Sequence, residues 1–159
     1  GINLVRIDGL FPCAFLNKNA PALTFPEELG FTTVLCHQLG LSPWQQNLDA
    51  PLALERFGSG TFFLQLFVRG NPFRGNQFQD EPWIAAIRQL QGLNRLAGLV
   101  VYGSPYFCHD LLDVLNPSIP FAYSPGQMPE AQNHVLSSLL ISNKNNKNIN
   151  SLEPFEFTD

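Results

Sequence analysis

The chain has 159 residues, of which 45% are hydrophobic and only 14% charged, and its formal net charge is −4. This length allows one domain that buries about 70% of the surface its unfolded chain would expose, and the shortage of charge favours a surface partly covered by another domain or a second copy. Nucleic-acid binding needs a concentrated positive face, and because the sequence has no basic cluster, this class of partner is excluded.

No apolar run reaches the length of a membrane span, and no charged segment precedes an apolar one as in a secretory signal. We therefore expect no membrane partner; the compartment is left open, with the cytoplasm slightly favoured. Gly1 is not a start methionine, so we expect the chain to be a segment of a longer protein. Cys13, Cys36 and Cys108 are odd in number, widely spaced and without a C-x-x-C pair, which predicts buried thiols rather than disulfides.

The chain is organised around a strand predicted over residues 61–69. Its core, FFLQLFV, has one polar residue, Gln65. A run that is apolar on both faces is typical of a central strand covered on both sides. Residues 2–8 predict a short strand, and residues 31–36, which are rich in β-branched side chains, predict another. The sequence leaves open whether the strand over residues 2–8 joins the main sheet.

The connections in this half of the chain predict little helix. Residues 10–30 contain three prolines and no sustained period, which predicts an ordered linker with one helical turn at residues 26–29. Residues 52–57 predict a short helix that ends before Gly58.

The second half of the chain repeats one arrangement three times: a buried strand, a loop rich in glycine and proline, and a helix that begins with proline. The later strands are predicted over residues 96–102 and 121–123, and the helices begin after Asp80 and run over residues 105–115 and 129–140. The first two helices are expected to face the core with Trp83, Ile84, Ile87 and Leu90, and with Phe107, Leu111, Leu112 and Leu115.

Strands that alternate with helices imply right-handed crossovers. The sequence therefore predicts an α/β fold, a three-layer αβα sandwich with a mostly parallel, doubly wound sheet. Residues 1–30 would form a linker and first short strand that pack on this domain, residues 31–140 the sandwich, and residues 141–159 a polar, asparagine-rich tail.

Three loops leave the carboxyl ends of parallel strands, so we expect them side by side along one edge of the sheet. Such an edge could hold a sugar hydroxyl or a carboxylate, or dock on another domain. The alternative is turn chemistry, in which glycine, proline and serine only shape loops and cap helices; the arginines could likewise grip a carboxylate or phosphate, or pair with an acid of their own chain. The candidate residues of this edge are Arg69, Asn71, Arg74, Ser104, Tyr106, Ser124 and Gln127.

Motifs for common chemistries are missing. Neither RGNPFRG nor YGSPYF matches a P-loop or the G-x-G-x-x-G of a dinucleotide fold, so no cofactor is expected. Ser104 lies in G-S-P rather than G-x-S-x-G, which favours a helix cap, and His37, His109 and His134 have no metal-binding spacing, so no metal is expected. An independent enzyme that uses Ser104 or Cys108 with His109 has no base and orienting group placed by a motif. Glycoside hydrolysis requires two acids, or one acid and another proton carrier, on either side of the scissile bond. The sequence places no pair of carboxylates on the edge.

The segments RGNPFRG, LAGLVVYGSPYF and IPFAYSPGQMPEAQ resemble the carboxyl-terminal α/β domain of bacterial, especially cyanobacterial, two-domain glycoside hydrolases of family three. That group includes β-glucosidase-like and β-N-acetylglucosaminidase-like enzymes. The resemblance implies that a (β/α)8 barrel comes first in the polypeptide and carries the nucleophilic aspartate, and that the α/β domain packs against it. The catalytic barrel of the same polypeptide is thus the expected partner, with a carbohydrate as a second candidate.

The resemblance also bears on catalysis. A barrel takes about 250 residues by itself, and the β-glucosidase-like members place an acid/base glutamate in the second domain. No loop glutamate matches it here, because Glu55 and Glu81 lie at predicted helix ends. We therefore expect an accessory domain with no catalytic residue of its own. The alternative is a stand-alone, doubly wound domain that binds a small polar ligand or a protein at the same edge.

Overall fold

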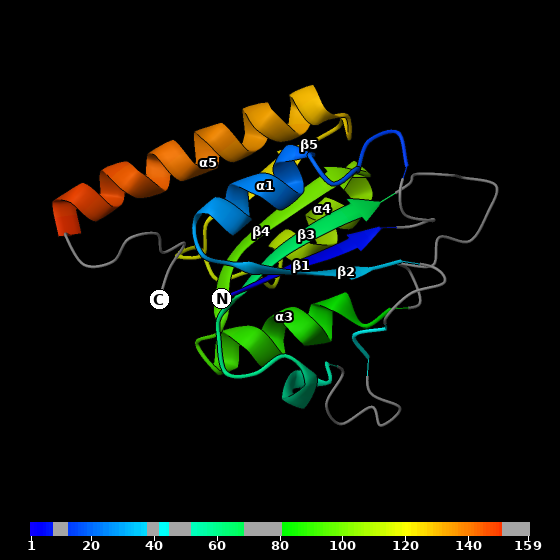
Figure 1. Ribbon diagram of the computed structural model, residues 1–159. Helices are drawn as coiled ribbons and strands as arrows, with labels where there is room; N and C mark the ends of the chain where they lie inside the picture. Colours follow the sequence, from blue (N-terminus) through cyan, green and yellow to red (C-terminus); the bar gives the residue numbers. More distant parts are fainter. Residues whose placement is uncertain (8–12, 38–41, 45–51, 69–80, 151–159) are drawn as a thin grey trace.

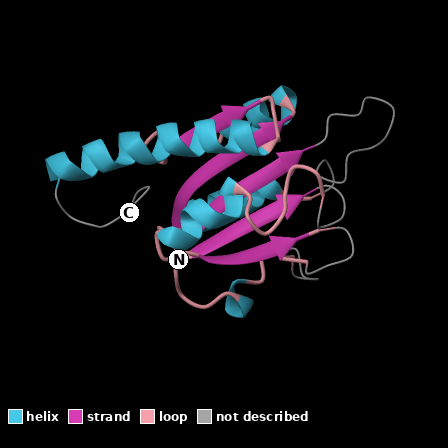
Figure 2. Cartoon of the chain, turned by 45° about the horizontal axis from the view of Figure 1, so that its top comes forward, coloured by secondary structure: helices cyan, strands magenta, loops and turns pink. Residues whose placement is uncertain are grey.

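A computed structural model describes residues 1–7, 13–37, 42–44, 52–68 and 81–150. Within these residues, all five strands are parallel and form one sheet in the order β2-β1-β3-β4-β5 (Figures 1 and 2). The strands are β1 (Ile2–Ile7), β2 (Thr32–Cys36), β3 (Phe62–Val68), β4 (Leu96–Gly103) and β5 (Phe121–Ser124). The strand order reverses between β1 and β3, which makes their carboxyl ends the switch point of the sheet.

Helices cover both faces of the sheet. On one face lie α1 (Pro21–Glu28) and α5 (Pro129–Asn150), which contact each other. On the other face lie α3 (Trp83–Gly92) and α4 (Pro105–Leu112), with the short 3-10 helix η1 (Leu54–Arg56) nearby (Figure 1). This arrangement confirms the predicted αβα sandwich and doubly wound parallel sheet.

The predicted central strand is the middle of the sheet, and all seven residues of β3 are buried. Alternate side chains point to opposite faces, as the pleat of a strand requires. Phe62, Leu64 and Leu66 pack with α3 and α4, whereas Phe63 and Phe67 pack with α1 and α5. The strand therefore joins two separate hydrophobic cores.

A hydrogen-bonded row of polar side chains crosses the core beneath α1. Gln65 Nε2 donates to Asn3 Oδ1 at 2.8 Å, and Tyr102 Oη donates to Gln65 Oε1 at 2.8 Å. Asn3 Nδ2 continues the row to Thr33 Oγ1 at 3.0 Å. Four neighbouring strands thus exchange side-chain hydrogen bonds inside the protein, where an unpaired polar group would be costly.

The same row explains a helix that the sequence did not predict. Pro26 lies inside α1, where it has no N–H to donate to the carbonyl of Ala22, four residues earlier. The Ala22 oxygen instead accepts hydrogen bonds from Asn3 Nδ2 at 3.0 Å and from Gln65 Nε2 at 2.6 Å. The prediction of a single turn at residues 26–29 is therefore wrong, because side chains from the sheet satisfy the group that proline leaves open.

The structure answers one question that the sequence left open and differs from the sequence prediction in two details. The strand over residues 2–7 joins the sheet, and it lies between β2 and β3. Helix α5 continues to Asn150 instead of ending at residue 140. Ile84 and Leu112 are exposed rather than inward-facing, because the buried sides of their helices are formed by Trp83, Ala86, Ile87 and Leu90 in α3 and by Cys108 and Leu111 in α4.

Replacing Gln65 by leucine tests the polar row. The substitution keeps the approximate volume but leaves Asn3, Ala22 and Tyr102 each short of a partner. We expect the free energy of unfolding, measured by urea denaturation, to fall by about 3 kcal/mol or more. Tyr102→Phe, which removes one hydroxyl, should lower it by only about 1 kcal/mol. Equal and small effects of the two changes would contradict a connected row.

Candidate functional site

The carboxyl ends of the parallel strands gather at one edge of the sheet (Figure 2). We call residues 103–106 and 124–128, which follow the neighbouring strands β4 and β5, the β4–β5 rim. Of the residues that the sequence nominated, Ser104, Tyr106, Ser124 and Gln127 lie on this rim, whereas Arg69, Asn71 and Arg74 lie outside the described residues.

The two serines of the rim make local hydrogen bonds. Ser104 is the N-cap of α4, and its Oγ accepts the N–H of Phe107 at 3.4 Å, which confirms the predicted cap. Ser124 is buried, and its Oγ accepts the N–H of Gly126 at 3.1 Å and donates to the Gly126 carbonyl at 2.9 Å. Both hydroxyl groups therefore serve turn chemistry.

Gln127 holds strand ends together. Its Nε2 donates to the carbonyl oxygen of Val68 at 3.1 Å and to that of Tyr102 at 3.3 Å, so the loop after β5 is tied to the ends of β3 and β4. Gln132 of α5 donates in turn to the Gln127 carbonyl at 2.8 Å. An amide whose two N–H groups are both used in this way has no donor left for a ligand.

At Gly103 the backbone of the rim lies so close to the end of β3 that a side chain would not fit. Its φ of +114° is strained for other residues, and a Cβ atom there would lie 2.0 Å from the Val68 carbonyl oxygen. Tyr123 Oη donates to the Gly103 carbonyl at 2.6 Å. The glycine of the G-S-P motif is thus required by packing between strand ends.

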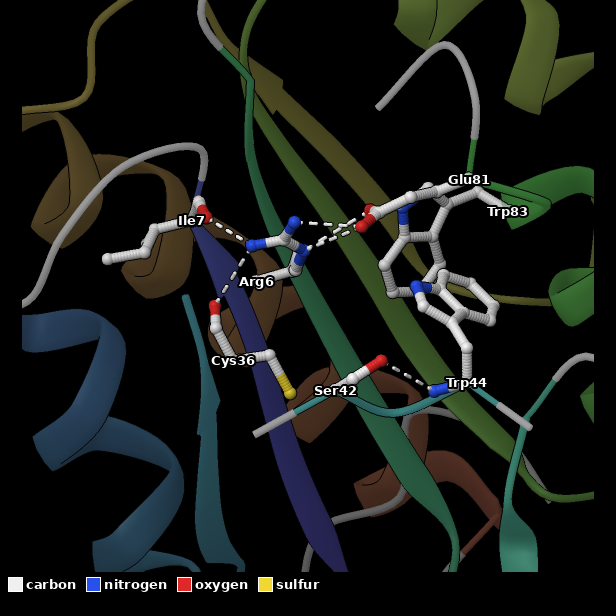
Figure 3. A network of polar contacts seen from close by, with 7 residues as sticks. All are labelled: Arg6, Ile7, Cys36, Ser42, Trp44, Glu81 and Trp83. Atoms are coloured by element: carbon white, nitrogen blue, oxygen red, sulfur yellow. Dashed lines mark hydrogen bonds and ion pairs between the residues drawn. The ribbon is translucent and has the colours of Figure 1, made fainter. Parts of the chain in front are cut away.

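At the switch point lies an ion pair that sequence reasoning missed. Arg6 of β1 and Glu81, just before α3, are joined by Nη2–Oε2 at 2.8 Å and by Nε contacts of 3.2 Å to both carboxylate oxygens. Arg6 Nη1 also donates to the carbonyls of Ile7 at 2.5 Å and Cys36 at 3.5 Å (Figure 3). The two side chains are only 7% and 15% exposed. The one available sequence signal was an arginine on the same strand face as Ile2 and Leu4.

One tryptophan bonds to the pair, and a second packs against the first. Trp83 Nε1 donates to Glu81 Oε1 at 3.0 Å, and its ring meets that of Trp44 edge to face with centroids 4.7 Å apart (Figure 3). Trp44 is positioned by its backbone N–H, which donates to Ser42 Oγ at 3.3 Å. Glu81 therefore meets both an arginine and an indole N–H, and each of its oxygens accepts from within the domain.

The thiols are poorly suited to chemistry. Burial raises the pKa of the Cys36 thiol to about 12, with the Arg6 charge opposing the shift and Glu81 adding to it. Burial also raises the pKa of the Cys108 thiol, so both sulfurs stay protonated near neutral pH. All three cysteines are free; Cys36 and Cys108 are buried and Cys13 is half-buried.

The described part of the chain has neither a metal-binding cluster nor a membrane-spanning helix. No three side chains among its His, Cys, Asp and Glu residues come together in a way that could hold a metal ion. None of its helices combines the length and apolarity needed to cross a lipid bilayer.

The outward surface of the β4–β5 rim is apolar. Tyr106 is 84% exposed and Met128 is 50% exposed, and Pro105 and Pro125 beside them are exposed as well. The rim therefore uses polar groups of Ser104, Ser124 and Gln127 within the chain, and it exposes side chains that are largely apolar, with the Tyr106 hydroxyl as a polar group among them. This surface suits contact with another apolar surface better than recognition of a polar small molecule.

Comparison with protein families identifies the kind of domain. Residues 1–141 match the family model described as "Bacterial Glycosyl hydrolase family 3 C-terminal domain". No curated protein matches the chain.

The Arg6–Glu81 pair can be tested by a double-mutant cycle. Arg6→Met leaves the Glu81 carboxylate buried without its cation, so we expect the free energy of unfolding to fall by about 3–5 kcal/mol. Adding Glu81→Gln removes the stranded charge and keeps an oxygen for Trp83, so the double variant should be more stable than Arg6→Met alone by at least about 1 kcal/mol. Additive losses in urea denaturation would show that the two groups are not coupled.

Because the pKa of the Cys36 thiol is raised in the folded protein, we expect the free energy of unfolding to fall at alkaline pH. Below about pH 8.5 the thiol is protonated in both states. Between that pH and about 12, the unfolded chain releases a proton that the folded protein keeps, so the unfolded state is favoured as pH rises. The slope contributed by this group is at most about 1.4 kcal/mol per pH unit.

The readout is the free energy of unfolding at pH 8 and pH 10. Cys36→Ala leaves a cavity that lowers stability equally at both values, so only the slope reports on ionisation. We expect a shallower slope in this variant than in the unchanged protein. Identical slopes would mean that the thiol ionises alike in both states.

Proposed function

This chain belongs to the family of bacterial glycosyl hydrolase family 3 C-terminal domains, and from this membership we propose that it is the accessory α/β domain of a two-domain glycoside hydrolase. In this role it packs on the catalytic (β/α)8 barrel of the same polypeptide and does not hydrolyse glycosides alone. The parent enzyme would be of the β-glucosidase or β-N-acetylhexosaminidase type.

The observation that carries the proposal is the engagement of Glu81. Glycoside hydrolysis uses two carboxyl groups, one on each side of the scissile bond, or one paired with another proton carrier. Glu81, the buried acid at the switch point, accepts hydrogen bonds from Arg6 and Trp83 through both oxygens. Asp110 and Asp113 lie on the exposed surface of α4. These contacts support an accessory rather than a catalytic role.

The competing functions have less support. An enzyme using Ser104 or Cys108 with His109 would need an activated nucleophile, but the Ser104 hydroxyl caps a helix and burial keeps the Cys108 thiol protonated. A stand-alone domain for a small polar ligand would need free polar groups on the rim, and those of Ser124 and Gln127 bond within the chain.

A hydrolysis assay tests the proposal. The isolated chain should release no chromophore from aryl β-glucosides or aryl β-N-acetylglucosaminides. The parent polypeptide, with its barrel present, should hydrolyse one of the two substrates. The paired assay thus separates an inactive accessory domain from an unsuitable substrate.

Glu81→Gln and Ser104→Ala serve as control variants if the isolated chain does release product. A rate that disappears with either change, in a variant that circular dichroism shows to be folded, would assign catalysis to this domain and reject the accessory role. A rate unaffected by both changes would indicate a contaminating enzyme. In that case, gel filtration should separate the activity from the chain.

A further inference from the structure

We propose that the β4–β5 rim is the surface by which this domain docks on its catalytic domain, with Tyr106 and Met128 as the anchors. This inference rests on the proposed function and adds the location and chemistry of the contact. The partner is the catalytic domain of the same polypeptide, because the family to which the chain belongs consists of C-terminal domains of glycosyl hydrolases.

The two anchors lie in corresponding places. Tyr102 and Ser124 are register partners in the neighbouring strands β4 and β5, and each anchor follows its strand partner by four residues. Tyr106 is in the first turn of α4 and Met128 directly precedes α5, and these helices cover opposite faces of the sheet. Tyr106 and Met128 therefore lie just beyond the ends of neighbouring strands, at the starts of helices on opposite faces of the sheet, and both are exposed.

The loops that carry the anchors are held in place before any partner binds. Gln127 ties the β5 loop to Val68 and Tyr102, Tyr123 binds the Gly103 carbonyl, and Ser104 caps α4. A surface that is ordered in advance loses little conformational entropy when it binds. Tyrosine is one of the residue types that are enriched among the strongest contributors to protein interfaces.

The polar groups of the rim argue for a protein partner and against a sugar. Carbohydrate recognition depends on precisely placed polar groups that fix the orientation of the ligand. On this rim, the hydroxyls of Ser104 and Ser124 and both amide hydrogens of Gln127 bond within the chain. The exposed side chains are those of Tyr106, Met128, Pro105 and Pro125, whose surface is largely apolar apart from the Tyr106 hydroxyl.

The experiment measures binding of the chain to the separately produced catalytic domain of its parent polypeptide by titration calorimetry. Tyr106→Ser and Met128→Ser should each weaken binding about tenfold or more, because each removes an interface anchor. Leu93→Ser is the matched control: Leu93 is 53% exposed and directly follows α3 at the opposite, amino-terminal edge of the sheet, so its loss should leave affinity unchanged. All three side chains are exposed, and circular dichroism will verify that each variant is folded.

The outcomes distinguish failure of the docking surface from failure of the proposed function. If the rim variants bind as tightly as the unchanged chain, whatever Leu93→Ser does, the docking surface is elsewhere and this inference fails while the proposed function stands. If the unchanged chain does not bind the catalytic domain, the proposed function fails and the inference with it. A saturation-transfer signal from glucose or N-acetylglucosamine that Tyr106→Ser abolishes, without an effect on docking, would assign the rim to sugar and overturn the inference.

Discussion

The fold depends on one buried carbonyl group. Pro26 interrupts the hydrogen bonding of α1, and the Ala22 oxygen that it leaves open accepts from Asn3 and Gln65 in the two strands beneath. An unpaired carbonyl in this position would be costly, so α1 is fixed over β1 and β3 and not elsewhere along the sheet. The N–H of the same residue donates to Gln132 at 3.0 Å, which links α1 to α5 in the same layer.

The sequence predicted those parts of the fold that depend on local pattern. Buried strands, proline-started helices and the Ser104 cap follow from periodicity and from residue types at helix ends. The linker prediction failed at α1 because a proline inside a helix is unfavourable by local rules, and the compensating side chain of Gln65 is 43 residues away from Ala22. The sequence marked Gln65 as the only polar residue of β3, yet its partners depend on strand order.

In the candidate site, too, the sequence predicted what depends on local pattern but not what depends on contacts between distant residues. The alternation of strands and helices predicted parallel strands whose following loops share one edge, and the loops after β4 and β5 do meet there. Local pattern does not reveal whether a polar side chain bonds inward or faces solvent, and Ser124 and Gln127 bond inward. The Arg6–Glu81 pair joins residues 75 positions apart, across the reversal of strand order, so no spacing in the sequence indicates it.

The two parts of the edge use their residues in opposite ways. At the switch point, where doubly wound folds usually bind ligands, Arg6 and Glu81 neutralise each other and are covered by Trp83. At the β4–β5 rim, polar groups lock the loops and Tyr106 is left exposed. A ligand site needs the reverse, with polar groups free and apolar ones forming its walls. The buried Arg6–Glu81 pair and the exposed Tyr106 and Met128 therefore support the proposal that the rim contacts another protein surface.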